Sequence, residues 1–213
     1  MTAVPSETSP ETSLSRGHKK KSRTRRQLLD AAVDVLAERG EGFSIADVAT
    51  RAGMSHGTFY NYFGDREELL DALVAHIVEE FASVAAREVE EPDAALRFAR
   101  ISARALASAV ESPNTMRVAL RLEAAQRALL LAGPLSYLQQ DLVDGHRSGR
   151  FTESPDDATL DVILGSLLLA ARRVVDGESS PAYRSSVIRR LLMSLGVDGD
   201  EADRIAVQAV AKA

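Results

Sequence analysis

The sequence lacks the residues that stabilise many small or secreted proteins. It contains no cysteine and no tryptophan among 213 residues, and aromatic residues make up only 5%. Without cysteine there can be no disulfide and no thiolate metal ligand, which is consistent with a cytoplasmic protein. Few aromatics beside abundant alanine and leucine favour helices over sheets, because strands are enriched in aromatic and β-branched side chains. We therefore expect an all-α protein of about nine or ten helices.

Long apolar segments are missing as well. The longest strongly apolar stretch, Val162–Ala171, is ten residues bounded by Asp161 and Arg172, whereas crossing a bilayer needs about 20. The first fifteen residues are rich in Ser, Thr, Pro and Glu, so they indicate a disordered tail and not a secretory signal. We expect no membrane partner.

Patterns of catalytic or cofactor-binding residues are scarce. The four histidines, His18, His56, His76 and His146, have no metal-ligand spacing, and no glycine-rich loop could cradle a phosphate, so we expect no metal and no cofactor. The segment Gly53–Gly57 does match G-x-S-x-G, the nucleophile elbow of α/β-hydrolases. That elbow requires a strand before the serine and a parallel sheet beneath it. The residues before Ser55 have helical periodicity instead, so a hydrolase remains an alternative on this short match alone.

Positive charge is concentrated near the N-terminus of an otherwise acidic chain. The formal net charge is −5, yet residues 1–66 carry ten basic and eight acidic residues, while residues 67–213 carry 16 and 23. Within the first part lies a dense basic run: Arg16, Lys19, Lys20, Lys21, Arg23, Arg25 and Arg26. Such a run suggests a local site for a polyanion. A solubilising tail explains the charge equally well.

Apolar residues have helical spacing over most of the chain. Residues 28–36 carry Leu, Ala and Val at positions i, i+1, i+4, i+7 and i+8, which is typical of one buried helix face. Ser44 and Asp47 fit a capping box at the start of a second helix, and Ser55 can cap a third. Five pairs with proline in second place, between residues 91 and 181, mark further helix starts.

These signals divide the chain into three parts. Residues 1–22 form a disordered tail with a basic arm, residues 23–66 a small helical domain, and residues 67–213 a larger helical bundle. We expect the helix that begins at Asp65 to join the two domains.

The second and third helices are short and meet at Ala52–Ser55. Gly53 allows a tight turn between them, so the pair predicts a helix-turn-helix, whose second helix can enter the major groove of DNA. Helical spacing turns Met54, Phe59 and Phe63 inward. The outer side keeps polar and aromatic residues that suit phosphates and base edges: His56, Gly57, Thr58, Tyr60, Asn61 and Tyr62.

Here the sequence resembles the DNA-binding domain of the TetR family of regulators. The resemblance covers Arg25 to Leu70, about a fifth of the chain. The matching residues are the basic start, Ala31-Ala32, Glu38-Arg39-Gly40, Phe43-Ser44-Ile45, Asp47-Val48-Ala49, Arg51-Ala52-Gly53-Met54-Ser55, Gly57-Thr58-Phe59-Tyr60, Tyr62-Phe63 and Asp65-Arg66-Glu67-Glu68-Leu69-Leu70. Two departures are Tyr62, where the family often has histidine, and Arg66, where it often has lysine. Both substitutes can still bond phosphate.

The resemblance implies phosphate contacts from Ser44, Thr58, Tyr60 and Tyr62, and it places Ser55, His56 and Gly57 near base edges. With the outward side chains and the basic run, the candidate DNA-binding residues are Ser44, Ser55, His56, Gly57, Thr58, Tyr60, Asn61, Tyr62, Arg66, Lys19, Lys20, Lys21, Arg23 and Arg25. The alternative for Tyr60 and Tyr62 is packing against the first helix, and His56 could be an idle surface residue.

In the family, the C-terminal domain forms the dimer. The helix from about Asp156 to Val175 is apolar on nearly all sides, and the next helix is also rich in leucine, so both must be buried on several faces. The predicted dimer residues are Leu160, Ile163, Leu164, Gly165, Leu167, Leu168, Ala171, Val187, Ile188, Leu191, Leu192 and Leu195. Alternatively, both helices fill the core of a monomer.

The family's C-terminal domain also binds a small effector. Candidate effector-binding residues on the helices between Ala94 and Gly149 are Phe98, Ile101, Arg104, Met116, Leu120 and Tyr137, with ordinary core packing as the alternative for each. We therefore expect a homodimeric repressor that binds double-stranded operator DNA, is released by an unidentified small molecule, and is associated with the nucleoid while bound. A non-specific DNA-binding protein is the remaining alternative.

Overall fold

The computed structural model of the protein describes residues 16–86, 90–131 and 133–213. The predicted tail over residues 1–15 lies outside the described residues. The described part contains eleven α-helices, one short 3-10 helix and no strand, which confirms the all-α class. In chain order the elements are α1 (Arg16–Arg39), η1 (Gly40–Gly42), α2 (Ile45–Arg51), α3 (His56–Tyr60), α4 (Arg66–Ala86), α5 (Ala94–Glu111), α6 (Pro113–Arg121), α7 (Glu123–Leu131), α8 (Gly133–Arg147), α9 (Asp157–Val175), α10 (Pro181–Ser194) and α11 (Gly199–Lys212).

The helix count differs from the predicted nine or ten because of α7. Only Leu122, with the extended dihedrals φ −78° and ψ 110°, separates α6 from α7. Neither proline nor glycine marks this break, so the sequence pattern missed it. The proline pairs did mark real starts: Pro113 and Pro181 are the first residues of α6 and α10.

The N-terminal prediction needs a correction. Residues 16–22, expected in a disordered tail, form the first turns of α1. Lysine and arginine are good helix formers. Moreover, this segment continues a helix that is held in place by buried apolar residues between Leu28 and Ala37.

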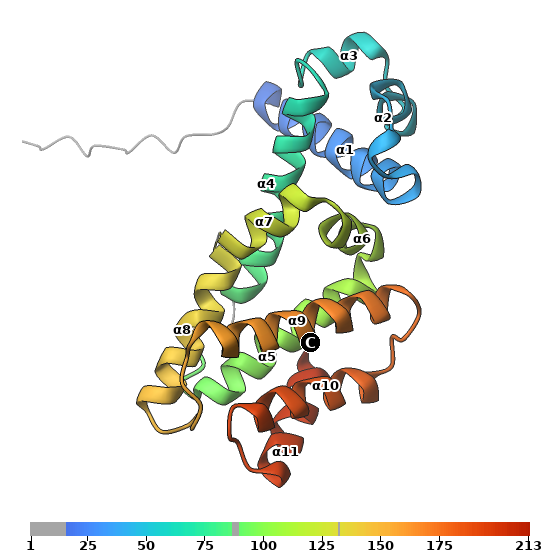
Figure 1. Ribbon diagram of the computed structural model, residues 1–213. Helices are drawn as coiled ribbons and strands as arrows, with labels where there is room; N and C mark the ends of the chain where they lie inside the picture. Colours follow the sequence, from blue (N-terminus) through green and yellow to red (C-terminus); the bar gives the residue numbers. More distant parts are fainter. Residues whose placement is uncertain (1–15, 87–89, 132) are drawn as a thin grey trace, which may run out of the picture.

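The helices form two groups joined by α4 (Figure 1). At one end α1, α2 and α3 form the head; at the other, α5 to α11 form the body. The core of the head does not stop at α4. Its buried residues Phe59 and Phe63 belong to one apolar cluster with Leu73 of α4 and with Val118 and Ala119 of α6. The head therefore rests on α6 as well as on α4.

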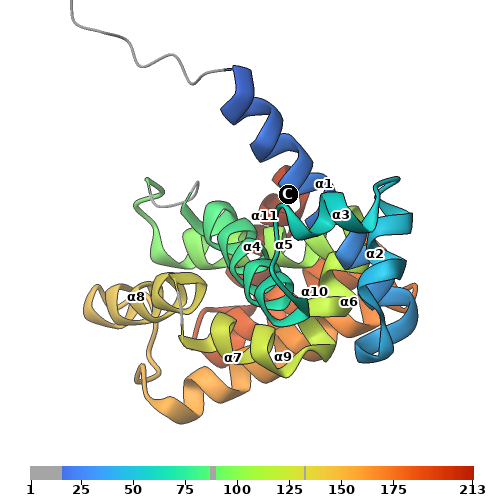
Figure 2. The same cartoon turned by 90° about the horizontal axis from the view of Figure 1, so that it is seen from above.

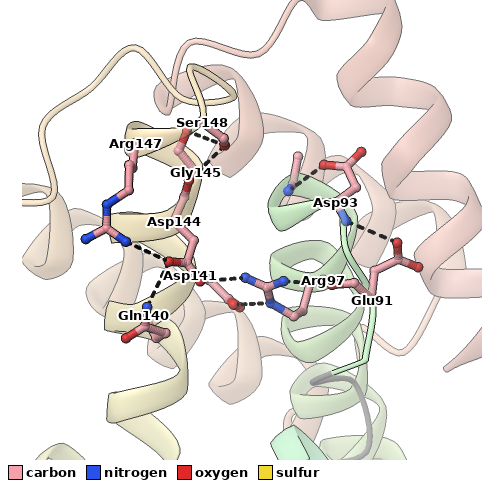
Figure 3. A network of polar contacts seen from close by, with 10 residues as sticks. Glu91, Asp93, Arg97, Gln140, Asp141, Asp144, Gly145, Arg147 and Ser148 are labelled. Carbon is pink, nitrogen blue, oxygen red and sulfur yellow. Dashed lines mark hydrogen bonds and ion pairs between the residues drawn. The ribbon is translucent and has the colours of Figure 1, made fainter.

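The body encloses a buried ion pair between α5 and α8 (Figure 3). The Nε atom of Arg97 lies 2.5 Å from an oxygen of Asp141, and its other nitrogens reach Asp144 at 3.3 Å and the carbonyl of Glu91 at 2.7 Å. Asp141 is only 3% exposed. Burial raises the pKa of the Asp141 carboxyl and the nearby charge of Asp144 adds to this, although Arg97 acts in the opposite direction.

Among the described helices, none has the length and apolar character needed to cross a bilayer.

Candidate nucleic-acid interface

The second helix begins with a complete capping box, as expected. The Ser44 hydroxyl accepts from the Asp47 backbone N–H at 3.2 Å, and the Asp47 carboxylate accepts from the Ser44 N–H at 2.9 Å. Arg39 adds an ion pair to Asp47 at 2.5 Å. These contacts lower the pKa of the half-buried Asp47 carboxyl, with the hydrogen bonds from Ser44 as the main cause. The start of α2 is thereby fixed against the end of α1.

A tight turn then sets the direction of α3. Gly53 has φ +68°, a left-handed conformation that favours glycine. Ser55 follows as the N-cap: its hydroxyl accepts from the Thr58 N–H at 3.1 Å and lies 3.0 Å from the Thr58 hydroxyl. The predicted inward residues Phe59 and Phe63 are 0% and 1% exposed. Two buried rings and one cap therefore hold this five-residue helix on the head.

The outward side of α3 is exposed and polar. Ser55, His56, Gly57 and Asn61 are exposed, and Tyr60 is 52% exposed. The His56 and Tyr60 rings lie edge to face with their centres 6.2 Å apart. The half-buried members of the predicted set are Thr58 and Tyr62. This places seven of the predicted residues along one short segment at the tip of the head.

Ser44 and Arg66, outside α3, are also engaged by their own chain. The Ser44 hydroxyl serves the α2 cap, although it remains exposed. The Arg66 guanidinium lies 4.5 Å from the centre of the Phe43 ring and donates to the Glu41 carbonyl. This contact ties α4 to η1, so the structure does not bring Arg66 to the exposed surface of α3.

The basic run lies on α1. Lys19, Lys20, Lys21, Arg23 and Arg25 are all exposed, and seen from above, the first turns of α1 project past the rest of the molecule (Figure 2). The Arg25 guanidinium lies 5.2 Å from the centre of the Phe63 ring, just after α3. The C-terminal end of the basic run therefore lies beside the residues that follow α3.

The predicted dimer residues divide between the interior and the surface. Six of them are buried in their own chain: Ile163, Ala171, Ile188, Leu191, Leu192 and Leu195. Their side chains pack in the apolar clusters of the body. Four more are half-buried: Leu160, Leu164, Leu167 and Val187. Gly165 and Leu168 are exposed.

Sequence reasoning missed an apolar strip next to these two residues. On α9, Val162 is 57% exposed and Leu169 is 56% exposed. Val162, Gly165 and Leu169 follow at i, i+3 and i+7, so they share one side of α9. A methyl group placed on Gly165 would meet no atom within 4 Å. The spacing was visible in the sequence, but a helix apolar on nearly all sides did not show which side faces outward.

The predicted effector residues do not gather at one site. Phe98 is fully buried in the core that α5 shares with α8 to α11. Met116 and Leu120 lie in a separate cluster with α9 residues, and Arg104 donates to the carbonyl of Ala213 at the end of the chain. Ile101 and Tyr137 are half-buried. Of this set, Met116 borders a cavity between α4, α5 and α6.

This cavity has a volume of about 180 Å³ and lies where the three helices meet. Its lining is Glu80, Phe81, Ser83, Ser108, Glu111, Ser112, Thr115 and Met116. A second cavity of about 290 Å³ shares Glu80, Ser112 and Thr115 and extends to Asp34 on α1. At its edge the Asn114 amide donates to Asp34 at 2.9 Å. This joint between head and body was also missed, because its residues come from three distant segments.

The match to the hydrolase motif lacks its structural setting. Helix α2, and not a strand, precedes Gly53. The Ser55 hydroxyl caps α3, where a nucleophile would need a neighbouring base.

Comparison with known proteins agrees with the geometry of the head. The family described as "Bacterial regulatory proteins, tetR family" matches residues 28–73, which run from α1 through the helix-turn-helix into α4. Solved structures that match over most of the chain have the same fold. The head is a TetR-family DNA-binding domain. The chain is a DNA-binding transcriptional regulator.

Several known regulators are similar to this chain over longer stretches. The fatty acid metabolism regulator of Bacillus subtilis (strain 168) is 28% identical over 139 residues, 61% of this chain and 72% of the relative. The repressor LfrR of Mycolicibacterium smegmatis is 40% identical over 82 residues, which span 36% of this chain and 42% of LfrR. RolR, solved with the ligand resorcinol, has a TM-score of 0.64 and 28% identity, over 88% of this chain and 95% of RolR.

Proposed function

We propose that this regulator is a homodimeric repressor, which binds a palindromic operator through α3 and releases it when a small molecule binds the body. We assign residues 23–66 to DNA binding and 67–213 to dimerisation and effector binding. One observation carries the proposal: α3 presents exposed His56, Tyr60 and Asn61 on a helix fixed by the Ser55 cap and two buried rings. LfrR is described as a repressor, which supports repression and not activation for this regulator.

Within this surface we assign different tasks to different residues. Tyr60 and Thr58 position the helix through phosphates, while His56 and Asn61 read base edges. We keep Ser44, Ser55 and Tyr62 as further contacts to the phosphate backbone of the DNA. We withdraw Arg66 from the contact set, because its guanidinium is held between Phe43 and Glu41.

Selection of binding sites from random DNA tests this assignment. Wild type should enrich a palindrome. Tyr60→Phe should keep the selected sequence and weaken every site by about 1–3 kcal/mol per dimer, the value of one or two hydrogen bonds. His56→Ala should change the preferred sequence. Enrichment of no palindrome by wild type, or an unchanged preference in His56→Ala beside a changed one in Tyr60→Phe, would contradict the proposal.

The exposed strip on α9 supports the dimer. We propose that Val162, Gly165, Leu168 and Leu169 meet their copies across a two-fold axis. Gly165 has open space above its α-carbon, so a large side chain of the second copy can approach there. A helix-turn-helix protein usually reads a palindrome as a two-fold dimer, which requires such a self-complementary face.

For the effector we propose the cavities where α4, α5 and α6 meet. Both helices that carry the head, α4 and α6, border this space, so a molecule bound there acts on the head directly. Glu80 and Glu111 in the lining suit a cationic or hydroxylated molecule better than an anion. The volume of about 180 Å³ suits a small one. RolR, with its ligand resorcinol, shows that a related protein accepts a small molecule.

A thermal-shift screen of small amines and polyols, followed by operator release, tests this site. Ser108→Phe, which fills the cavity, should abolish the shift for each hit. Ser136→Phe on α8, an exposed position outside the cavity, should leave it unchanged. Hits that bind Ser108→Phe as well as wild type would place the effector elsewhere.

A further inference from the structure

The first turns of α1 form an exposed helical segment at the edge of the head. We call residues 16–27 the arm helix. From Lys19 to Gln27 every residue is exposed except Thr24, which is half-buried. Figure 2 shows this segment leading away from the head on the side of α3.

The composition of the arm helix narrows what can bind it. Between Arg16 and Gln27 there is no acidic and no large apolar residue, and Leu28 is the first side chain that enters the core. A helix that lies on a membrane or packs against a protein needs an apolar face, and this segment has none. Its chemistry fits a polyanion.

The position of one basic row connects it with the recognition helix. Lys21, Arg25 and Leu28 follow at i, i+4 and i+7, so they lie on the same side of α1. Leu28 points into the core of the head, and Arg25 lies over the Phe63 ring at the end of α3. Lys21 is therefore one turn further out on the side that faces α3. Lys19 and Arg23 lie on the opposite side of the helix.

The arm helix is also electrostatically unfavourable when the protein is alone. Like charges one turn apart, as in Lys19–Arg23 and Lys21–Arg25, destabilise a helix. Cations near a helix N-terminus oppose its dipole, and no acidic residue lies in the first turn. A row of phosphates would remove both penalties at once.

We propose that DNA stabilises the start of α1: the arm helix lies along the duplex that flanks the operator and sets Lys21 and Arg25 against its phosphates. This proposal rests on the proposed function, because α3 must first bring the duplex to the head. It goes further because it requires the arm to be helical, and not only positively charged, in order to strengthen DNA binding.

Substitutions at Ser22 separate the effect of charge on DNA binding from the effect of helical structure. Ser22→Pro leaves every charge in place but removes a backbone N–H and clashes with the preceding turn. Ser22→Ala is the matched control, because alanine is the best helix former. Both are compared with wild type and with a deletion of residues 1–23, on a selected operator with long flanks. The measurements are affinity from 50 to 300 mM salt and hydrogen exchange of the amides of residues 17–24, with and without DNA.

We expect these amides to gain protection on DNA in wild type and in Ser22→Ala, and not in Ser22→Pro. The slope of log affinity against log salt should fall by about 0.9 for each phosphate that the arm no longer neutralises. Ser22→Pro should reduce the slope nearly as much as the deletion does. Lys21→Gln should reduce the slope more than Lys19→Gln, because only Lys21 faces the duplex.

Equal affinity and slope for Ser22→Pro and wild type would overturn the proposal, since a flexible arm would then serve as well. Equal reductions in Lys21→Gln and Lys19→Gln, or a deletion without effect, would overturn it too. Failure of the proposed function looks different: neither wild type nor the deletion would then select any sequence. If the deletion still selects the wild-type palindrome, the function of α3 stands whatever the arm helix does.

Discussion

The head and the body hold their helices together by different means. In the head, polar contacts lie at the surface and at helix ends: Ser44 with Asp47, Ser55 with Thr58, and Arg51 with Glu38 at 2.5 Å. In the body, an arginine–carboxylate pair is buried between two long helices (Figure 3). Exposed contacts each contribute little to stability, while a broken buried pair leaves a charge in an apolar interior. A substitution at an exposed polar contact of the head should therefore cost little stability. A substitution of one member of the buried pair in the body should cost much more.

Helix α6 belongs to both regions. Val118 and Ala119 lie in the core of the head, while Met116 and Leu120 of the same helix lie in the core of the body. Opposite sides of one short helix are thus fixed in two cores. A displacement of α6 within the body must move the head, which gives α6 a part in coupling beside α4.

The largest effect should come from the proposed dimer surface on α9. Leu169→Arg places a charge on the exposed apolar strip of α9. We expect a monomer that loses operator affinity by about 100-fold or more, because the second head then no longer binds as part of the same molecule. Sedimentation at micromolar concentration and operator titration measure both effects.

Val207→Arg is the matched control for this change. Val207 is 54% exposed on α11 and lies outside the strip, so this variant should remain dimeric. A wild-type monomer at micromolar concentration, or a dimer of unchanged stability in Leu169→Arg, would show that α9 is not the interface.

The next largest effect should come from the buried pair of the body. Arg97→Met leaves the Asp141 carboxylate without its main counter-charge, which should lower the free energy of unfolding by about 3–5 kcal/mol. The double variant Arg97→Met, Asp141→Leu should recover much of this stability, because no buried charge remains. Chemical denaturation at neutral pH measures the three proteins.

The pH dependence of this pair has a definite sign. Burial raises the folded-state pKa of Asp141 above its unfolded value of 3.8, so folding takes up a proton between the two values. The contribution to stability is full below the unfolded pKa and falls as the pH rises through the folded pKa. The penalty in Arg97→Met should accordingly shrink toward acid pH. A penalty that grows in acid would contradict the assignment to Asp141.

A smaller effect should appear at the joint between α1 and α6. Asn114→Asp turns its hydrogen bond to Asp34, now 2.9 Å long, into a repulsion between carboxylates. We expect operator affinity to fall within the usual range of coupling energies, about 1–3 kcal/mol. Adding Asp34→Asn restores a donor and an acceptor and should restore affinity. If the double variant stays as weak as the single one, this contact does not couple α6 to the head.

The two regions also differed in how far their sequences predicted them. In the head, the turn and the helix caps depend on residues close in sequence, such as Gly53 and Ser55, so these helices and most of their outward residues could be predicted together. In the body, apolar spacing predicted α9 and α10 but not which side of each is covered. That depends on α5 and α11, which pack against them from distant parts of the chain. The Arg97–Asp141 pair spans 44 residues, and no local pattern marks it.

The smallest effect should come from the cap of α2. Ser44→Ala removes the hydroxyl that accepts from the Asp47 N–H, and removal of a helix N-cap typically costs about 1 kcal/mol. Ser44→Thr keeps a hydroxyl and should be destabilised much less. Thermal unfolding of the three proteins at neutral pH measures the difference.

The same unfolding measurements at acid pH test whether the Ser44 hydroxyl acts through the Asp47 carboxylate. Hydrogen bonds from Ser44, aided by Arg39, hold the folded-state pKa of Asp47 below its unfolded value of 3.8. The carboxylate therefore contributes stability above the unfolded pKa and loses it as the pH falls through the folded pKa. Ser44→Ala loses only the hydroxyl's own bond to this carboxylate, 2.8 Å long, and keeps the bond from the backbone N–H. The gap between wild type and Ser44→Ala should therefore narrow in part below about pH 4, where the carboxylate is protonated. A gap of constant size from pH 7 to pH 3 would mean that the hydroxyl acts without the Asp47 carboxylate.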